Sequence, residues 1–259
     1  MFKWMFGHRR RPRLDVAWMS ECGKVRSENQ DSFFVDPRGS VFCVADGMGG
    51  ADGGGIASKM VCDRMSAAAA GVRGFADLMK RSSDAITNAN REIREYAAVR
   101  SWRQMGTTIA ALFVNPETGS EAVIAHIGDS RVYRLRKGLL ESLTHDHTVA
   151  GELGRRSCAK NLAEELARRA GPLSHVLTRA IGIDDVVIAD WRKIEIIPGD
   201  TLMICSDGVY DMAEYAGIHA ALSQGATASD AAKLLADTVE AAGSADNYTA
   251  IIIKTGEAI

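Results

Sequence analysis

The feature that most constrains this chain is an apolar run that ends in a carboxylate and then in glycine. Residues 41–50 read VFCVADGMGG, and the first five are typical of a buried β-strand. The strand is predicted to present Asp46, followed by a turn too small to block approach to the Gly47 carbonyl. A carboxylate beside an open carbonyl suits a hard cation such as Mg²⁺ or Mn²⁺. Asp-Gly is also a common turn dipeptide, so this motif alone is equally consistent with a simple tight turn.

The same placement of an acidic residue recurs four times, which favours the metal site over the simple turn. Each of these carboxylates adjoins an apolar strand, and two of them, like Asp46, are next to glycine; they are Asp31, Asp129, Asp207 and Asp246. Such carboxylates are costly to bury unless a positive charge neutralises them, and two divalent cations bridged by water would do so. Histidine is scarce near them, which disfavours zinc.

Composition narrows the class of protein. The chain has 259 residues, of which 46% are hydrophobic, and a net charge of -2, so it has no general attraction to nucleic acid or anionic lipid. Its five cysteines include no C-x-x-C pair, which predicts reduced thiols in a cytoplasmic protein. No apolar stretch is long enough for a transmembrane segment.

The N-terminus differs from the rest of the chain in its charge. Residues 1–13 read MFKWMFGHRRRPR, with the aromatic residues ahead of the arginines, which is the reverse of a signal peptide. This segment is predicted to be a disordered basic tail, with an arm that docks on a membrane surface or a partner as the alternative. Residues 14–259 contain no linker and no repeat and are predicted to form a single domain.

The order of the predicted elements indicates an α+β protein with antiparallel sheets, because strands come in runs joined by hairpins and helices come in pairs between the runs. Residues 128–130 are interpreted as one of these hairpin turns, and Thr227 with Asp230 forms a capping-box pattern. Residues 145–179 are polar and irregular, which is typical of a functional lid. Strands are predicted at 14–20, 32–35, 41–45, 109–114, 121–127, 131–136, 139–143, 186–197, 201–205 and 248–253, and helices at 56–70, 75–98, 213–222 and 227–241.

Eight motifs strengthen this interpretation when they are taken in order along the chain. They are VRSENQD, VADGMGG, GTT, IGDSRVYRL, LTHDH, LTRAIG, CSDGVYD and ADNYTAIII. Together they resemble the metal-dependent serine/threonine protein phosphatases of type 2C, in their compact bacterial form. The resemblance implies a four-layer α-β-β-α sandwich of two antiparallel sheets flanked by helix pairs. It also makes residues 145–179 the flap beside the active site.

The resemblance assigns roles to the acidic residues. It implies two or three divalent ions, manganese or magnesium. Asp46 would bridge two of them, the Gly47 carbonyl would bind the second, and Asp207 and Asp246 would hold the first. Asp129 resembles the ligand of a third, weaker metal, with Asp207 shared.

The resemblance also implies the reaction, which is hydrolysis of phosphoserine and phosphothreonine on proteins by direct attack of a metal-bridging water. Asp31 would orient metal-bound waters, and Arg26 would grip the substrate phosphate, since its planar fork suits two phosphate oxygens. Met48 stands where eukaryotic relatives often carry a histidine proposed as the general acid. Metal-bound water is then the expected proton donor to the leaving group.

The expected partners are phosphorylated proteins and a bacterial serine/threonine kinase that the enzyme opposes, and a monomer is expected because the chain shows no coiled-coil heptads. Two other classes are weighed against this one. A catalytically silent regulatory or phosphopeptide-binding member of the same fold is disfavoured because all five candidate positions are acidic. A two-metal phosphodiesterase or nuclease is disfavoured by the near-neutral charge and the lack of a basic-aromatic strip.

Overall fold

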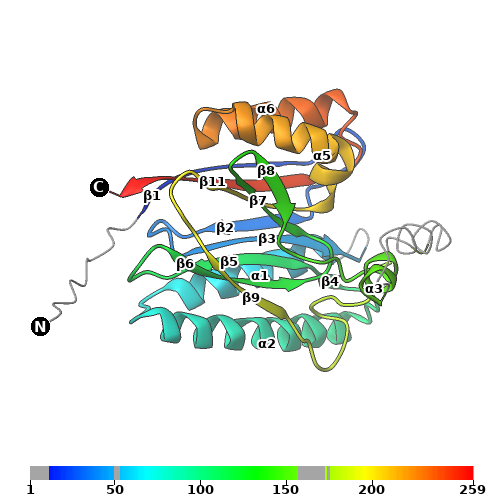
Figure 1. The fold of residues 1–259 in the computed structure, drawn as a ribbon. Coiled ribbons are helices and arrows are strands. Elements are labelled where there is room, and N and C mark those ends of the chain that lie inside the picture. The colour runs from blue at the N-terminus through cyan, green and yellow to red at the C-terminus, as the bar shows by residue number, and fades with distance from the viewer. Residues whose placement is uncertain (1–11, 50–52, 157–172, 174–175, 259) are drawn as a thin grey trace, which may run out of the picture.

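Two antiparallel sheets packed face to face form the centre of the molecule (Figure 1). The computed structural model describes residues 12–49, 53–156, 173 and 176–258. One sheet consists, in order, of β1 (Pro12–Glu21), β11 (Tyr248–Ala258), β10 (Thr201–Cys205), β7 (Arg131–Arg136) and β8 (Leu139–Ser142). The other consists of β2 (Asp31–Val35), β3 (Val41–Met48), β5 (Ile109–Val114), β6 (Glu121–Ile127) and β9 (Asp190–Glu195), with the short β4 (Gly106–Thr107) paired to the end of β3.

Pairs of helices cover the two outer faces, which confirms the predicted α-β-β-α sandwich (Figure 1). The β2-β3-β5-β6-β9 sheet is covered by α1 (Gly54–Ala69) and α2 (Phe75–Arg100), and the β1-β11-β10-β7-β8 sheet by α5 (Asp207–Gln224) and α6 (Ala228–Ala241). The short helix α3 (Val149–Arg156) lies in the region predicted as a flap. None of the helices in the described ranges is both long enough and apolar enough to cross a bilayer.

The continuous apolar run at the start of β3 follows from its central place in the sandwich. Val41 and Cys43 contact the core under α1 and α2, whereas Phe42 and Val44 contact the core between the two sheets. All four are fully buried. A strand covered on both faces has no polar side, so its sequence shows no alternation.

The sequence prediction of a hairpin at 128–130 is wrong. β6 belongs to one sheet and β7 to the other, so these three residues carry the chain from sheet to sheet. Gly128 has a φ of 102°, a conformation that favours glycine, and so permits this crossing. Hydrophobic alternation shows that two strands follow one another but does not show with which strand each one pairs.

Three predicted boundaries also differ from the structure. The strand predicted at 186–197 is limited to β9, and β1 begins at Pro12, inside the segment predicted as a tail. Helix α5 begins at Asp207 instead of residue 213, and Glu214 interrupts it with a non-helical φ of 52° and ψ of 175°. That kink divides the helix, and the predicted range of 213–222 covers mainly the part after the kink. Residues 1–11 of the predicted tail and 157–172 of the predicted flap lie outside the described residues.

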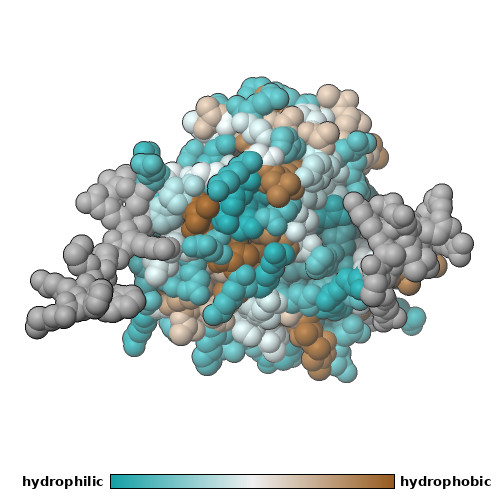
Figure 2. Space-filling model, in the orientation of Figure 1, coloured by the Kyte–Doolittle hydropathy of each residue, from teal (hydrophilic) through white to brown (hydrophobic). Residues whose placement is uncertain are grey.

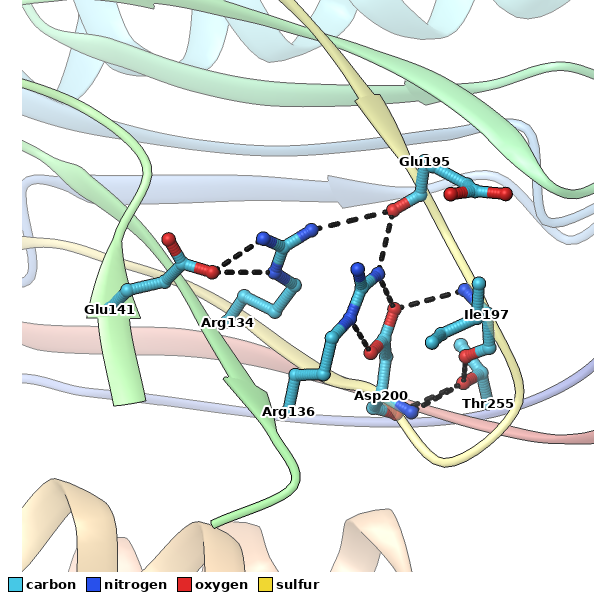
Figure 3. Close-up of polar contacts among 7 residues, drawn as sticks. All are labelled: Arg134, Arg136, Glu141, Glu195, Ile197, Asp200 and Thr255. Atoms are coloured by element: carbon cyan, nitrogen blue, oxygen red, sulfur yellow. Dashed lines mark hydrogen bonds and ion pairs between the residues drawn. The ribbon is translucent and has the colours of Figure 1, made fainter. Parts of the chain in front are cut away.

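Two arginines of β7 make ion pairs beside their own sheet and hydrogen bonds to the Glu195 carbonyl of β9 in the other sheet (Figure 3). The guanidinium of Arg136 donates to both carboxylate oxygens of Asp200 at 2.6 Å, and its Nη2 also donates to the Glu195 carbonyl of β9 at 2.9 Å. Arg134, two residues earlier, pairs with Glu141 of β8. The Asp200 side chain is fully buried, so its charge depends on Arg136 for compensation.

Candidate active site

A cavity of about 570 Å³ lies where β3 and β4 meet the turn before β11 and the first residues of α5. Its lining includes six of the seven residues predicted from the sequence, namely Arg26, Asp46, Gly47, Asp129, Asp207 and Asp246. Glu28 adds another carboxylate, and Arg26 is the one cation among the described residues that line the cavity. The surface of this cavity is therefore strongly acidic.

Each carboxylate reaches the cavity from the end of a different element. Asp46 lies in β3 directly opposite Asp31, the first residue of β2. Asp129 lies in the crossing between β6 and β7, Asp207 is the first residue of α5, and Asp246 precedes β11. Because β2 and β3 belong to one sheet and β10 and β11 to the other, the two sheets together build the acidic site.

The main chain of Asp46 is held by the two threonines of the GTT motif. Thr108 N and Thr107 Oγ1 both donate to the Asp46 carbonyl, at 2.9 and 2.7 Å. The Asp46 N–H in turn donates to Thr108 Oγ1 at 2.9 Å. These bonds keep Asp46 in the ladder, and β3 continues to Met48 instead of turning after the carboxylate as expected.

Glycine is required at position 47 by close packing. A Cβ atom there would lie 2.2 Å from the Gly54 carbonyl oxygen and 2.7 Å from that of Gln30. The start of α1 and the residue before β2 therefore press directly on this part of β3. The glycine-rich sequence reflects this close approach, and it keeps the wall of the cavity at Gly47 free of side chain.

Asp31 stands behind the lining and is only 8% exposed. Ser206 Oγ donates to its Oδ2 at 2.7 Å, whereas Oδ1 has no hydrogen-bond partner among the described residues. Removal from water raises the pKa of Asp31 to about 6. A buried carboxylate oxygen without a donor is expected to accept from water or to face a cation.

The other buried carboxylates are perturbed in the same direction. Removal from water, with Asp207 as a neighbouring charge, raises the pKa of Asp129 to about 7. The pKa values of Asp46 and Asp207 are also raised, first by burial and then by neighbouring carboxylates. Divalent cations would relieve both the burial cost and the mutual repulsion, so these residues fit a metal centre of hard oxygen ligands.

The carboxylates do not form a complete metal-binding set on their own. In the part of the chain that the structure describes, no three histidine, cysteine, aspartate or glutamate side chains converge so as to hold one ion. Asp246 is instead paired with Arg26, whose Nε and Nη2 donate to its two oxygens, both at 2.7 Å. The arginine predicted to grip phosphate thus has its fork on a predicted metal ligand.

The start of the predicted flap is fastened to the site through Arg131. Its guanidinium donates to both oxygens of Asp146, at 2.9 and 2.6 Å, and lies 3.5 Å from the centre of the Tyr210 ring. Tyr210 Oη donates to the Asp129 carbonyl at 3.2 Å. Arg131 therefore connects the flap, α5 and the sheet crossing that carries Asp129.

Sequence reasoning did not assign roles to three residues that hold the site together: Thr108, Ser206 and Asn247. Ser206 and Asn247 each adjoin a motif carboxylate in the sequence, whereas Thr108 belongs to the GTT motif and meets Asp46 only in the fold. Their exposed fractions are 2%, 0% and 7%. A small polar side chain next to a buried strand end was a usable signal, but only the fold shows which main-chain groups it meets.

Comparisons with known proteins identify the family of this chain. The sequence profile of the family described as protein phosphatase 2C matches residues 21–244. The serine/threonine phosphatase stp of Listeria innocua is 30% identical over 93% of this chain and 96% of its own length. The PPM Ser-Thr phosphatase MsPP of Mycobacterium smegmatis, solved with cacodylate, is 34% identical with a TM-score of 0.79, covering 93% of this chain and 98% of that one. The catalytic domain of the phosphatase PstP, solved with two manganese ions, is 28% identical with a TM-score of 0.78, covering 94% and 98%.

The chain belongs to the protein phosphatase 2C family, of the bacterial PPM type. Its activity is that of a protein-serine/threonine phosphatase, and the silent alternative is not favoured. Phosphoproteins are therefore its substrates, and divalent metal dependence accompanies membership of this family.

Proposed function

We propose that the acidic cavity is the phosphatase centre and that it hydrolyses phosphoserine and phosphothreonine in one step. The observation that carries this proposal is the meeting of Asp46, Asp129, Asp207 and Asp246 around one cavity, with Asp31 behind them. The described lining contains no cysteine and no histidine. A water nucleophile without a phosphoenzyme fits such a lining better than a thiol or imidazole nucleophile does.

The residues that would hold the metal ions are those predicted from the sequence. Asp46 would be shared between two ions, with the Gly47 carbonyl on one and Asp207 and Asp246 on the other. Asp129 would serve a third ion together with Asp207. Two or three ions of manganese or magnesium are proposed, and the two manganese ions of PstP support this choice. Bound there, the ions would supply a nucleophile at neutral pH and positive charge beside the phosphate.

Arg26 is proposed to bind the substrate phosphate through the same two donors that now engage Asp246. Its side chain is 57% exposed at the mouth of the cavity, so it can turn toward an incoming phosphate. A guanidinium fork matches two oxygens of a phosphate as well as two oxygens of a carboxylate. Asp31 is proposed to orient water, with its unpaired Oδ1 as the acceptor.

The biological setting proposed for this chain is the bacterial cytoplasm. There it would act as a monomer that reverses phosphorylation by a serine/threonine kinase. Relatives that are named serine/threonine phosphatases support the substrate class. The kinase rests on analogy with the family, and the monomeric state rests on the lack of coiled-coil heptads in the sequence.

Phosphate release from a phosphothreonine peptide tests the proposed centre. Metal-stripped protein should release no phosphate, Mn²⁺ or Mg²⁺ should restore release, and Asp207→Asn should abolish it while the circular dichroism spectrum stays unchanged. A dinucleotide phosphodiester should remain intact under the same conditions. Metal-independent release, or full activity in Asp207→Asn, would overturn the assignment.

A further inference from the structure

Asn247 lies directly beneath the loop that carries Arg26 and is only 7% exposed. Its Nδ2 donates to the carbonyl of Cys22 at 2.8 Å and to that of Glu28 at 2.9 Å. Its Oδ1 accepts from the N–H of Gln30 at 2.9 Å. One side chain therefore fastens the main chain on both sides of Arg26.

The same residue is tied to the carboxylate that Arg26 engages. The Asn247 N–H donates to Asp246 Oδ1 at 2.8 Å, and Arg26 Nε donates to that same oxygen at 2.7 Å. Asn247 thus contacts both ends of the loop that carries Arg26, which we call the arginine loop, and also the Asp246 carboxylate that Arg26 engages. Asn247 therefore has hydrogen bonds to both segments whose separation determines the distance between Arg26 and Asp246.

Packing of the main chain gives independent support. Gly23 has a φ of 74°, and a Cβ atom there would lie 2.3 Å from the Asp246 carbonyl oxygen and 2.6 Å from that of Ser244. Lys24 N donates to the Ser244 carbonyl at 2.8 Å. The arginine loop therefore rests on the 244–247 turn by direct contact between main chains, and Asn247 is at the centre of that contact.

Hydrogen bonds hold this loop, and apolar packing does not: besides the bonds already named, Cys22 Sγ donates to the Arg26 carbonyl at 3.3 Å and Lys24 Nζ to the Glu240 carbonyl at 2.9 Å. Residues 24–28 are all exposed, and Val25, the apolar one among them, is 72% exposed. A loop without buried apolar side chains depends on its hydrogen bonds for a defined position. Loss of the Asn247 bonds would loosen the main chain on both sides of Arg26, and misplacing a catalytic donor by about 1 Å can cost about 10²-fold in rate.

We propose that Asn247 is a positioning residue that holds Arg26 at a fixed distance from Asp246, so that the phosphate-binding arginine and a metal-binding carboxylate stay in register. This inference rests on the proposed function of the cavity. Asparagine suits the role because its amide offers two donor hydrogens and an acceptor oxygen, and all three make hydrogen bonds at this position. Aspartate would set a carboxylate against two carbonyl oxygens, and alanine would leave three main-chain groups unpaired.

A double-mutant cycle between Asn247→Ala and Arg26→Ala tests the proposal, with kcat and KM for a phosphothreonine peptide and competitive inhibition by inorganic phosphate as readouts. Asn247→Ala should lower kcat/KM at least tenfold and weaken inhibition by phosphate. In the Arg26→Ala background, Asn247→Ala should change both quantities less than threefold, because the residue it positions is gone. Asn247→Ser serves as the milder variant if alanine prevents folding.

Asn90 offers a matched control. It is 3% exposed, its Nδ2 donates to the carbonyls of Asp184 and Asp185, and its Oδ1 accepts from the N–H of Gly182 at 2.7 Å, so it holds a loop with the same set of bonds. Asn90→Ala should lower stability, and its effect on kcat/KM should be the same with Arg26 present or absent. If Asn247→Ala also acts independently of Arg26, or leaves phosphate inhibition unchanged, the positioning role is refuted. Absence of metal-dependent release by the wild-type protein would instead refute the proposed function.

Discussion

At the residue scale, the site depends on the geometry of a few charged groups. Arg26→Lys keeps the positive charge but loses the fork that meets two oxygens at 2.7 Å. We expect kcat/KM for a phosphopeptide to fall on the order of 10²-fold, as for loss of one transition-state donor. Arg38→Lys, which affects the pair with Asp36 in the turn between β2 and β3, is the matched control and should retain activity. Equal activity in the two variants would contradict a role for Arg26 in the reaction.

The residues of the site were largely predictable, and their present contacts were not. The five aspartates and Gly47 stand out because each lies beside an apolar strand, and local sequence records that placement. Arg26 was predicted to face phosphate, yet its fork lies on Asp246. Ser206 was passed over because its partner, Asp31, is distant in the sequence and becomes a neighbour only when the two sheets pack.

At the element scale, the capping box of α6 provides a stability test remote from the site. Thr227 Oγ1 accepts from the Asp230 N–H at 3.1 Å, and the Asp230 side chain accepts from Thr227 N at 2.9 Å. Thr227→Ala should lower the free energy of unfolding by about 1 kcal/mol, measured by urea denaturation. Activity per folded molecule should stay constant, and a loss of activity larger than the loss of folded protein would show that α6 influences the site.

The ion pair between Arg136 and Asp200 makes a larger contribution to the free energy of unfolding (Figure 3). Arg136→Met leaves the fully buried Asp200 carboxylate without its cation and should cost about 3 kcal/mol of unfolding free energy. Arg134→Met removes a pair whose Glu141 side chain is 36% exposed, and it should cost less than about 1 kcal/mol. Similar urea midpoints for the two variants would show that burial of Asp200 does not determine how much its ion pair with Arg136 contributes to stability.

Most elements followed from sequence pattern, and the exceptions have physical causes. Hydrophobic runs located β5, β6, β7 and β10 to the residue, because alternation and burial act locally. The pairing of β6 with β9, and of β7 with β10, depends on which surfaces meet in three dimensions. The sandwich itself was identified through the order of the eight motifs, since no single strand specifies a sheet order.

At the scale of the whole molecule, the acidic cavity should make stability depend on pH and on metal. Folded Asp129 has a pKa of about 7 against an ordinary 3.8. At pH values between these two, and just above the higher one, the folded protein therefore binds more protons than the unfolded one. Stability should therefore fall as pH rises from about 6.5 to 8. The lowered pKa of His126, about 3 against 6.5, acts in the opposite direction, mainly below pH 6.5 and only weakly above it.

Urea unfolding of metal-stripped protein across this window measures the effect. Asp129→Asn should flatten the pH dependence, and saturating Mn²⁺ should raise the free energy of unfolding most at the alkaline end, where the carboxylates are ionised. A free energy of unfolding that rises from pH 6.5 to pH 8 without metal would contradict the raised pKa of Asp129.

The face of the molecule drawn in Figure 2 has an ordinary mixture of side chains. On the face shown in Figure 2, hydrophobic side chains are interrupted by hydrophilic ones, as on an ordinary protein surface. Among the described residues, buried carboxylates with raised pKa values gather around one cavity at the end of the sandwich. This is why we propose that the active site lies where the two sheets meet.

The measurement that tests this account most directly is the binding isotherm of Mn²⁺ to metal-stripped protein, compared with that of Asp46→Asn. The wild-type protein should bind at least two ions. Asp46→Asn should lose affinity by more than the roughly 10- to 100-fold that removal of an outer-shell partner costs, because Asp46 is proposed to contact two ions itself. Unchanged stoichiometry and affinity in Asp46→Asn would contradict the claim that the acidic cavity is the metal centre.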